Sequence, residues 1–440
     1  MNKRSTALAM VLSLLSLGFL KAQNEKSISL NEAISLSLRN SKQLKNSQAK
    51  IEEATAALKE AVERRLPDVK VSGSWMWLSN ANIDVKSKSN SGNQNGSPDV
   101  SQAMYGIVNA SLPIYTGGRI RYGIESSRYL AEATKLDADN DRQTVIQNTI
   151  EAYINLFKAK SSVALVQENL AEARQRVKDF SNLERNGLLA RNDLLKAELQ
   201  TSNVELALLD AENNWKLANV NMNLLLGLPD QTELIPDSAM MNQTFSLKTL
   251  DEYVQAAYQG RRDINSVELK KKAAETAVKA TRAEFYPNVA LTSGYIAADI
   301  PKVVTVTNAI TFGPGLSYNI GSLWKTKSKV QQAEAKAKQA AIGQSMLKDE
   351  IRLQVNQGYL TFLSSQKKIE VYTKATEQAN ENYKIVLNKY NNSLATTTDL
   401  LDADVARLQA KMNSVFSKAD AVVAYNKLLQ VAGLLDENIK

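Results

Sequence analysis

The sequence contains neither cysteine nor histidine. Without cysteine, we expect no disulfide bond and no lipid anchor on an N-terminal cysteine. Without histidine, the commonest general base and metal ligand of proteins is missing. The sequence also has no nucleophile with a neighbouring base, no phosphate-binding loop and no metal-ligand cluster. It therefore predicts no catalytic residue, no cofactor and no metal site, which argues against an exported enzyme.

Proline is scarce, with 8 residues in 440, and the gaps between prolines are informative. None lies between Pro113 and Pro229, and none follows Pro314. Because a proline inside a helix costs about 3 kcal/mol, long uninterrupted helices are possible in these two stretches.

Long apolar runs are missing except at the N-terminus. Lys3 and Arg4 precede an apolar run over residues 7–20, which is too short to span a bilayer and is typical of a signal peptide. We expect residues 1–22 to be removed on export, with cleavage near Ala22. No later stretch approaches about 20 apolar residues, so no transmembrane helix is predicted.

The excess of positive charge is small, with 54 Lys and Arg against 46 Asp and Glu. The two signs are interspersed, and even the run Lys270-Lys271-Lys272 lies between Glu268 and Glu275. This pattern indicates solvated helix faces rather than a nucleic-acid site.

The sequence is internally duplicated. Apolar residues recur at alternating steps of 3 and 4 at Val163, Val166, Leu170, Ala173, Val177 and Phe180. A shift of 206 places a second ladder on Ile369, Tyr372, Thr376, Ala379, Tyr383 and Val386. A 3.5-residue repeat is typical of helices that supercoil around neighbours. We divide the chain into a first repeat, residues 23–235, and a second repeat, residues 236–440.

Each repeat is predicted to run helix, strand, strand, long helix and returning helix. In the first repeat these elements are expected at residues 28–66, 68–77, 104–114, 119–185 and 192–226, with a polar loop over 80–100. In the second repeat they are expected at 250–284, 289–298, 303–318, 323–391 and 398–433. The strand–helix junctions fall on Pro67, Gly117, Gly118, Pro287 and Gly321. Each long helix would measure roughly 100 Å.

The strand regions, about 68–115 and 288–318, alternate polar and apolar residues and are long enough to cross a bilayer. Four strands cannot close a barrel, and a sheet in lipid cannot leave an edge unpaired. Several copies would therefore have to supply eight, twelve or sixteen strands. The alternative is a pair of soluble hairpins packed on a helical core.

Three segments carry a family resemblance, together with the signal peptide and the order of elements. They are the junction at residues 112–119, the helix tip at 186–198 and the helix ending at 223–227. This set resembles the TolC-like outer-membrane efflux protein family. The resemblance implies a mainly α fold with a membrane β-barrel, in which three chains form twelve strands in the outer membrane and a helical α-barrel in the periplasm. It also implies a passive exit duct of a tripartite efflux pump or type I secretion system.

The implied partners are a periplasmic adaptor (membrane fusion) protein, an inner-membrane pump and outer-membrane lipid, with no nucleic acid. By resemblance, the adaptor-facing aperture falls on Asn186, Gly187, Leu188, Leu189, Ala190, Asn392, Ser393, Leu394, Ala395 and Thr396. Ser393 departs from the glycine of the first tip. Lys384 and Lys389 stand where some family members carry an acidic ring, so no such ring is expected here.

Asp193 and Asp399 lie in the first turns of the returning helices, where a carboxylate is favoured by the helix dipole. A periplasmic coiled-coil adaptor or scaffold would also account for the helical hairpins. That alternative does not account for two bilayer-length strand pairs at matching places in the repeats.

Overall fold

The computed structural model describes residues 25–81, 100–242, 245–301 and 303–435. The chain divides into two compact units, each drawn from both repeats. The first unit combines the chain up to Ser47 with Asp139–Arg262 and the chain from Lys348 onward. The second unit combines Gln48–Ala138 with Asp263–Leu347. The predicted signal peptide and most of the predicted polar loop lie outside the described residues.

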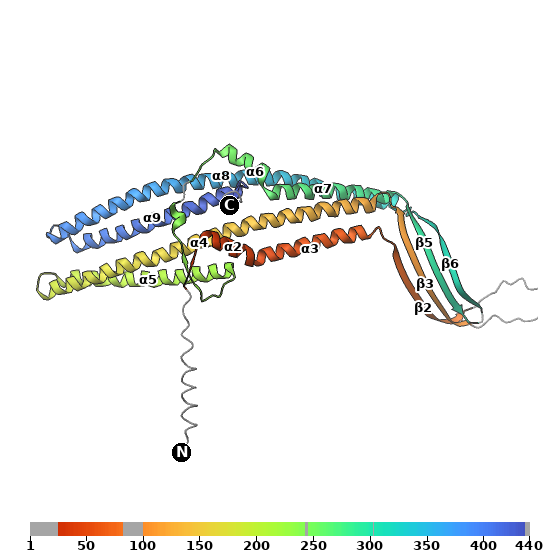
Figure 1. Ribbon diagram of the computed structural model, residues 1–440, viewed down its shortest axis with the longest axis horizontal. Coiled ribbons are helices and arrows are strands. Elements are labelled where there is room, and N and C mark those ends of the chain that lie inside the picture. Colours follow the sequence, from red (N-terminus) through yellow and green to blue (C-terminus); the bar gives the residue numbers. More distant parts are fainter. Residues whose placement is uncertain (1–24, 82–99, 243–244, 302, 436–440) are drawn as a thin grey trace, which may run out of the picture. The chain divides into compact units, whose positions relative to one another are not determined.

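The first unit is built from helices and a small sheet (Figure 1). Its elements are β1 (Glu25–Ile28), α2 (Leu30–Asn40), α5 (Arg191–Leu226), β4 (Glu233–Pro236), η1 (Ala239–Asn242), α6 (Leu250–Gly260) and α9 (Thr397–Val431). The C-terminal parts of α4 (Arg119–Arg185) and α8 (Ser322–Asn391) complete it. Strands β1 and β4 pair in parallel.

The second unit holds a four-stranded antiparallel sheet and its flanking helices. Its elements are α3 (Lys42–Glu63) from Gln48 onward, β2 (Asp68–Ala81), β3 (Val100–Tyr115), α7 (Arg262–Arg282) from Asp263 onward, η2 (Ala283–Phe285), β5 (Asn288–Ile300) and β6 (Val304–Ser317). The N-terminal parts of α4 and α8 complete it. The strand order is β2-β3-β5-β6, so β3 and β5 join the hairpins of the two repeats. Strands β2 and β6 have no neighbour on their outer sides within the described sheet.

The predicted junction residues lie between strands and helices. Pro67 precedes β2, Pro287 precedes β5, and Gly321 precedes α8. Gly117, with φ of 63°, lies in the turn from β3 into α4. A Cβ at Gly117 would lie 2.8 Å from the Ala283 carbonyl oxygen, so this turn requires glycine.

Two predicted helices are each divided in the structure. The helix expected at 28–66 breaks at Ser41 into α2 and α3, and that expected at 250–284 breaks at Arg261 into α6 and α7. Both residues have extended ψ, 121° at Ser41 and 129° at Arg261. The Ser41 hydroxyl accepts a hydrogen bond from the Leu44 N–H at 3.2 Å and so starts the next helix.

The short strands β1 and β4 were not predicted, and a buried tyrosine fixes them to α4. The Tyr153 hydroxyl donates to the Ile28 carbonyl at 2.8 Å and accepts from the Asp237 N–H at 2.8 Å. Burial raises the pKa of Tyr153 to about 12. Met222 and Leu226 of α5 pack in the same cluster.

None of the helices in the described ranges is apolar over a stretch long enough to cross a membrane.

Candidate functional site

The first helix tip is a tight turn stabilised by backbone hydrogen bonds. The Gly187 N–H donates to Glu184 at 2.9 Å and the Leu188 N–H donates to Leu183 at 2.8 Å. Gly187 has φ of 72°, the left-handed conformation that commonly ends a helix. The Leu188 side chain is 74% exposed.

The second tip has the same geometry without glycine. Ser393 has φ of 58°, and the N–H of Leu394 donates to Lys389 at 2.7 Å. Asn392 donates to the Asn388 carbonyl at 2.7 Å, as Asn186 does to Asn182 in the first tip. Leu394 is 76% exposed. The two tips therefore each present one leucine to solvent.

The helices returning from the tips begin differently. Thr396 and Asp399 form a reciprocal capping box at the start of α9, and these hydrogen bonds lower the pKa of Asp399. In α5 the capping position is Ala190, whose side chain cannot accept a hydrogen bond. Asp193 instead lies 3.5 Å from the Lys196 ammonium. The first-turn placement predicted for both aspartates is observed, but only Asp399 caps its helix.

Next to the tips, an apolar layer joins the helical hairpin α4–α5 of the first repeat to the helical hairpin α8–α9 of the second. Phe180 and Leu194 from the first hairpin are buried with Leu400 from the second. Phe180 also stacks on Tyr390 with ring centroids 5.6 Å apart. Ala197, Val386 and Leu387 extend the layer. Packing across this layer favours hairpin ends that lie against each other.

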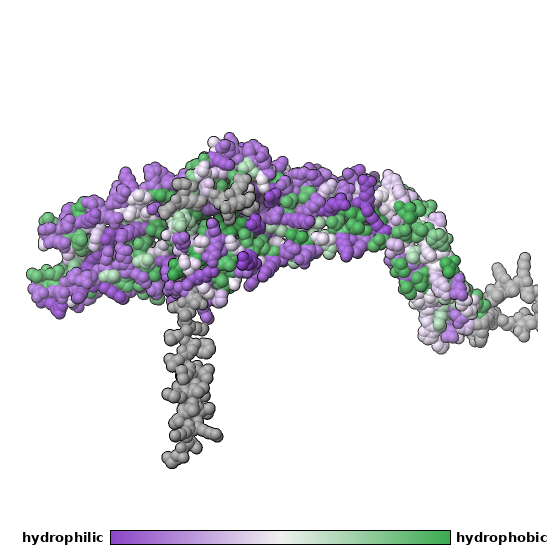
Figure 2. All heavy atoms as spheres, in the orientation of Figure 1, coloured by the Kyte–Doolittle hydropathy of each residue, from purple (hydrophilic) through white to green (hydrophobic). Residues whose placement is uncertain are grey.

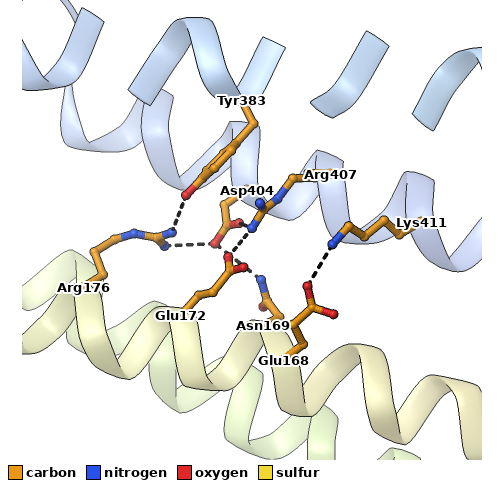
Figure 3. A network of polar contacts seen from close by, with 8 residues as sticks. All are labelled: Glu168, Asn169, Glu172, Arg176, Tyr383, Asp404, Arg407 and Lys411. Carbon is orange, nitrogen blue, oxygen red and sulfur yellow. Dashed lines mark hydrogen bonds and ion pairs between the residues drawn. The ribbon is translucent and has the colours of Figure 1, made fainter. Parts of the chain in front are cut away.

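Farther from the tips, a polar network links α4 to the helical hairpin α8–α9 (Figure 3). Its centre is Asp404 of α9, which is 4% exposed. The Arg176 Nη1 atom of α4 lies 2.9 Å from Asp404 Oδ2, and Arg407 donates to Asp404 Oδ1 at 2.8 Å. Asn169 donates to Oδ2 at 3.4 Å. Two arginines and an amide thus compensate one buried carboxylate.

Arg407 ties this centre to both α4 and α8. It forms an ion pair with Glu172 of α4, and its guanidinium lies over the Tyr383 ring, 3.9 Å from the centroid. Burial alone would lower the pKa of Arg407, but the hydrogen bond to Glu172 and the charges of Asp404 and Glu172 outweigh it and raise the pKa. Arg407 therefore stays charged and holds three helices.

The network is electrically balanced and closed to ligands. A peripheral pair, Lys411 with Glu168 at 3.1 Å, brings the total to three acids and three bases. The void beside these side chains measures about 10 Å³, roughly the space of one water. Such a cluster holds helices together and cannot bind a substrate.

A second candidate surface is one face of the four-stranded sheet in the second unit. Figure 2 shows apolar residues gathered over these strands. Large apolar side chains of these strands that are more than 60% exposed are Val69, Val71, Trp75, Trp77, Ile114, Ile310, Phe312 and Leu316. A soluble sheet buries such a face, so this one fits a lipid environment.

The last turns of α8, before the second tip, carry basic side chains and no acidic ones between Asn382 and Asn391. Lys384 and Lys389 are both exposed, and the Lys384 ammonium lies 4.0 Å from Glu381. Within the described ranges, no group of three or more acidic side chains is arranged to hold a metal ion.

The sequence matches the family profile described as outer membrane efflux protein over residues 33–228 and 253–434. It is 22% identical over 323 residues to the outer membrane efflux protein BepC of Brucella suis, covering 73% of this chain and 70% of BepC. It is 24% identical over 319 residues to the cation efflux system protein CusC of Escherichia coli K12, covering 70% of this chain and 65% of CusC.

The fold is similar to a solved outer-membrane protein. The crystal structure of VceC from Vibrio cholerae superposes with a TM-score of 0.75 at 18% identity. The match covers 92% of this chain and 96% of VceC. Nearly the whole chain therefore has the architecture of that protein.

Proposed function

Because this chain belongs to the outer membrane efflux protein family, it is an outer-membrane efflux protein, and we propose that three copies form a passive exit duct. The strands lie in the outer membrane and the helices extend into the periplasm. The duct would serve a tripartite efflux pump or a type I secretion system, and a partner pump would supply the energy. Its family consists of efflux channels, and we propose no catalytic step.

The two edges of the sheet support assembly from several copies. Strands β2 and β6 end a sheet whose strands contain 13 to 16 residues. In lipid, an unpaired strand edge costs several kcal/mol for each unsatisfied backbone group. Pairing β6 of one copy with β2 of the next would close twelve strands in a trimer.

Two exposed stripes on the helices support the same assembly. On α5 the exposed apolar residues are Leu195, Leu199, Leu206, Leu209, Leu217 and Leu224. On α8, within the first unit, they are Leu353, Leu360, Val371 and Ile385. The steps are 4, 7, 3, 8 and 7 in α5 and 7, 11 and 14 in α8. Each set therefore lies on one face of its helix, as expected of helices that pack on a neighbour. In Figure 1, α4 and α9 lie between α5 and α8, so these stripes would meet across copies.

The tips are proposed as the periplasmic aperture and adaptor contact, through residues 186–190 and 392–396. Their exposed leucines, Leu188 and Leu394, offer small apolar contacts to an adaptor. The network around Asp404 would hold the two hairpins of one copy together, and its release would let the aperture widen.

The apolar face of an unclosed sheet is the observation that carries this proposal. The test is conductance of the purified protein in planar bilayers, with its mass determined in the same detergent. A trimer with small, discrete channels is expected. A water-soluble monomer without conductance would contradict the duct and favour a periplasmic scaffold.

A further inference from the structure

The first unit contains an open cavity of about 670 Å³ that the conduit does not explain. Its walls come from α4, α8, α9 and the junction between α6 and α7. Three cationic side chains line it, Arg261, Arg262 and Lys427, and its described lining includes no carboxylate. Most of the other polar side chains in the lining are amides, including Gln143, Gln357 and Gln430.

The duplication provides an internal comparison for this cavity. In the first repeat, α2 ends at Asn40, whose side chain lies over Gly227 and donates to the Leu226 carbonyl at 2.6 Å. In the second repeat, the equivalent helix α6 ends at Gly260, which lies over Gly433. The second repeat therefore has no side chain where the first has Asn40. Gly260 and Gly433 both line the cavity.

The second repeat also carries more positive charge at this place than the first. Ser41 follows α2, whereas Arg261 follows α6, and the shift of 206 places Lys427 where the first repeat has Asn221. Arg261 braces the wall by donating to Gln354 at 2.9 Å and to the Val431 carbonyl at 3.1 Å. The second repeat thus carries positive charge beside a position that has no side chain.

Two of these cations are available to a ligand. Arg262 and Lys427 are exposed at the cavity and have no ion-pair partner among the described residues. The Lys427 ammonium donates to its neighbour Gln430 at 2.8 Å. A charge with free hydrogen-bonding capacity beside amide groups suits an acceptor-rich anion.

We propose that this cavity binds a small hydroxylated anion bearing a carboxylate or a phosphate group. Arg262 and Lys427 pair with the anionic group, and the glutamine and threonine side chains hydrogen-bond to hydroxyl groups. The volume falls within the range of pockets that enclose small molecules, about 300–1,000 Å³. This inference does not depend on the conduit, because the site is assembled within one chain.

The test is isothermal titration calorimetry on the full-length protein in detergent, with citrate and glucose 6-phosphate as separate probes. Saturable binding of at least one probe is expected, and the preferred probe distinguishes a carboxylate from a phosphate ligand. The double variant R262Q/K427Q should bind at least tenfold more weakly. The variant Lys418→Gln, at an exposed position of α9 outside the cavity, should bind like the wild type.

A second variant separates the cavity from general charge attraction. Thr361→Trp keeps every charge but places a large ring in the cavity wall, and it should also weaken binding at least tenfold. Absence of saturable binding of both probes would overturn the proposal. Equal weakening in Lys418→Gln, or unchanged binding in Thr361→Trp, would overturn it as well.

Discussion

At the scale of single residues, the two tips reach the same backbone conformation with different amino acids. Gly187 adopts φ of 72° and Ser393 adopts φ of 58°. A left-handed conformation costs a residue with a Cβ roughly 1 kcal/mol, which Ser393 already bears and Gly187 avoids. A Cβ on Gly187 meets nothing within 4 Å, so backbone strain is the only folded-state cost.

We therefore expect Gly187→Ala to lower the free energy of unfolding by about 1 kcal/mol. Ser393→Ala is the matched control and should change it by less than about 0.5 kcal/mol, because its strain is already present. Urea unfolding of the purified protein in detergent measures both. An equal loss of unfolding free energy in the two variants would show that Gly187 does not relieve backbone strain at the first tip.

The buried carboxylate of the polar network gives the second prediction. Asp404→Asn removes the charge that compensates Arg176 and Arg407, whose side chains are only 10% and 15% exposed. Breaking such a buried pair costs about 3 kcal/mol. The variant should unfold more easily and, if the network holds the aperture, give larger single-channel conductance.

Glu168→Gln serves as the control for Asp404→Asn. It breaks the ion pair with Lys411, in which the side chains are 56% and 30% exposed, and should cost no more than about 0.5 kcal/mol. Unchanged stability and conductance in Asp404→Asn would remove the network from the gating proposal.

At the scale of elements, long patterns were predictable and short interruptions were not. The helices at 119–185 and 323–391 follow from heptad spacing in proline-free stretches, and α4 and α8 match them within one residue. The breaks at Ser41 and Arg261 each involve a single residue, too few to disturb an amphipathic pattern. Strands β1 and β4 contain 4 residues each, too short for a period-two signal.

The polar network was missed because charged residues on helices usually face solvent. A signal was present, since Leu400, Asp404, Arg407 and Lys411 follow one another at steps of 4, 3 and 4. Charges in the phase of an apolar ladder require a partner across the helix interface. The partners on α4 have no comparable local signature, because they depend on which helix lies opposite.

The exposed stripes of α5 and α8 give the third prediction, which uses the absence of native cysteine. Leu209 follows Gly187 by 22 residues, and Val371 precedes Ser393 by 22, so both lie equally far from their tips. The double variant Leu209→Cys/Val371→Cys should form disulfides between copies and give covalent dimers and trimers on non-reducing gels. Packing of α5 on α8 across the copies would bring these positions together.

Leu209→Cys/Ile385→Cys is the control for this cross-link. Ile385 is exposed on the same stripe but lies 14 residues nearer the tip, about 21 Å along the helix. It should give no covalent oligomers. Equal cross-linking in the two pairs, or none in either, would contradict the proposed packing.

At the scale of the whole molecule, the proposed duct needs both an intact assembly and a docked pump. A substitution at a tip should affect docking without affecting assembly. Leu188 is 74% exposed and belongs to none of the buried clusters described above, so it contributes little to folding. If it contacts an adaptor, a charge there opposes docking because the charge must be desolvated in the interface. Leu188→Arg should therefore leave the trimer and its bilayer conductance intact while abolishing export.

Export is measured in a deletion strain as survival on the compounds against which the wild-type gene protects it. Lys178→Glu is the control, since Lys178 is exposed on α4, nine residues before Gly187, and its substitution reverses one surface charge. Cells carrying Leu188→Arg should be as sensitive as cells with an empty vector, and cells carrying Lys178→Glu should resemble the wild type. Full protection by Leu188→Arg would exclude this tip from the adaptor contact, whereas loss of the trimer would show that Leu188 acts in assembly instead.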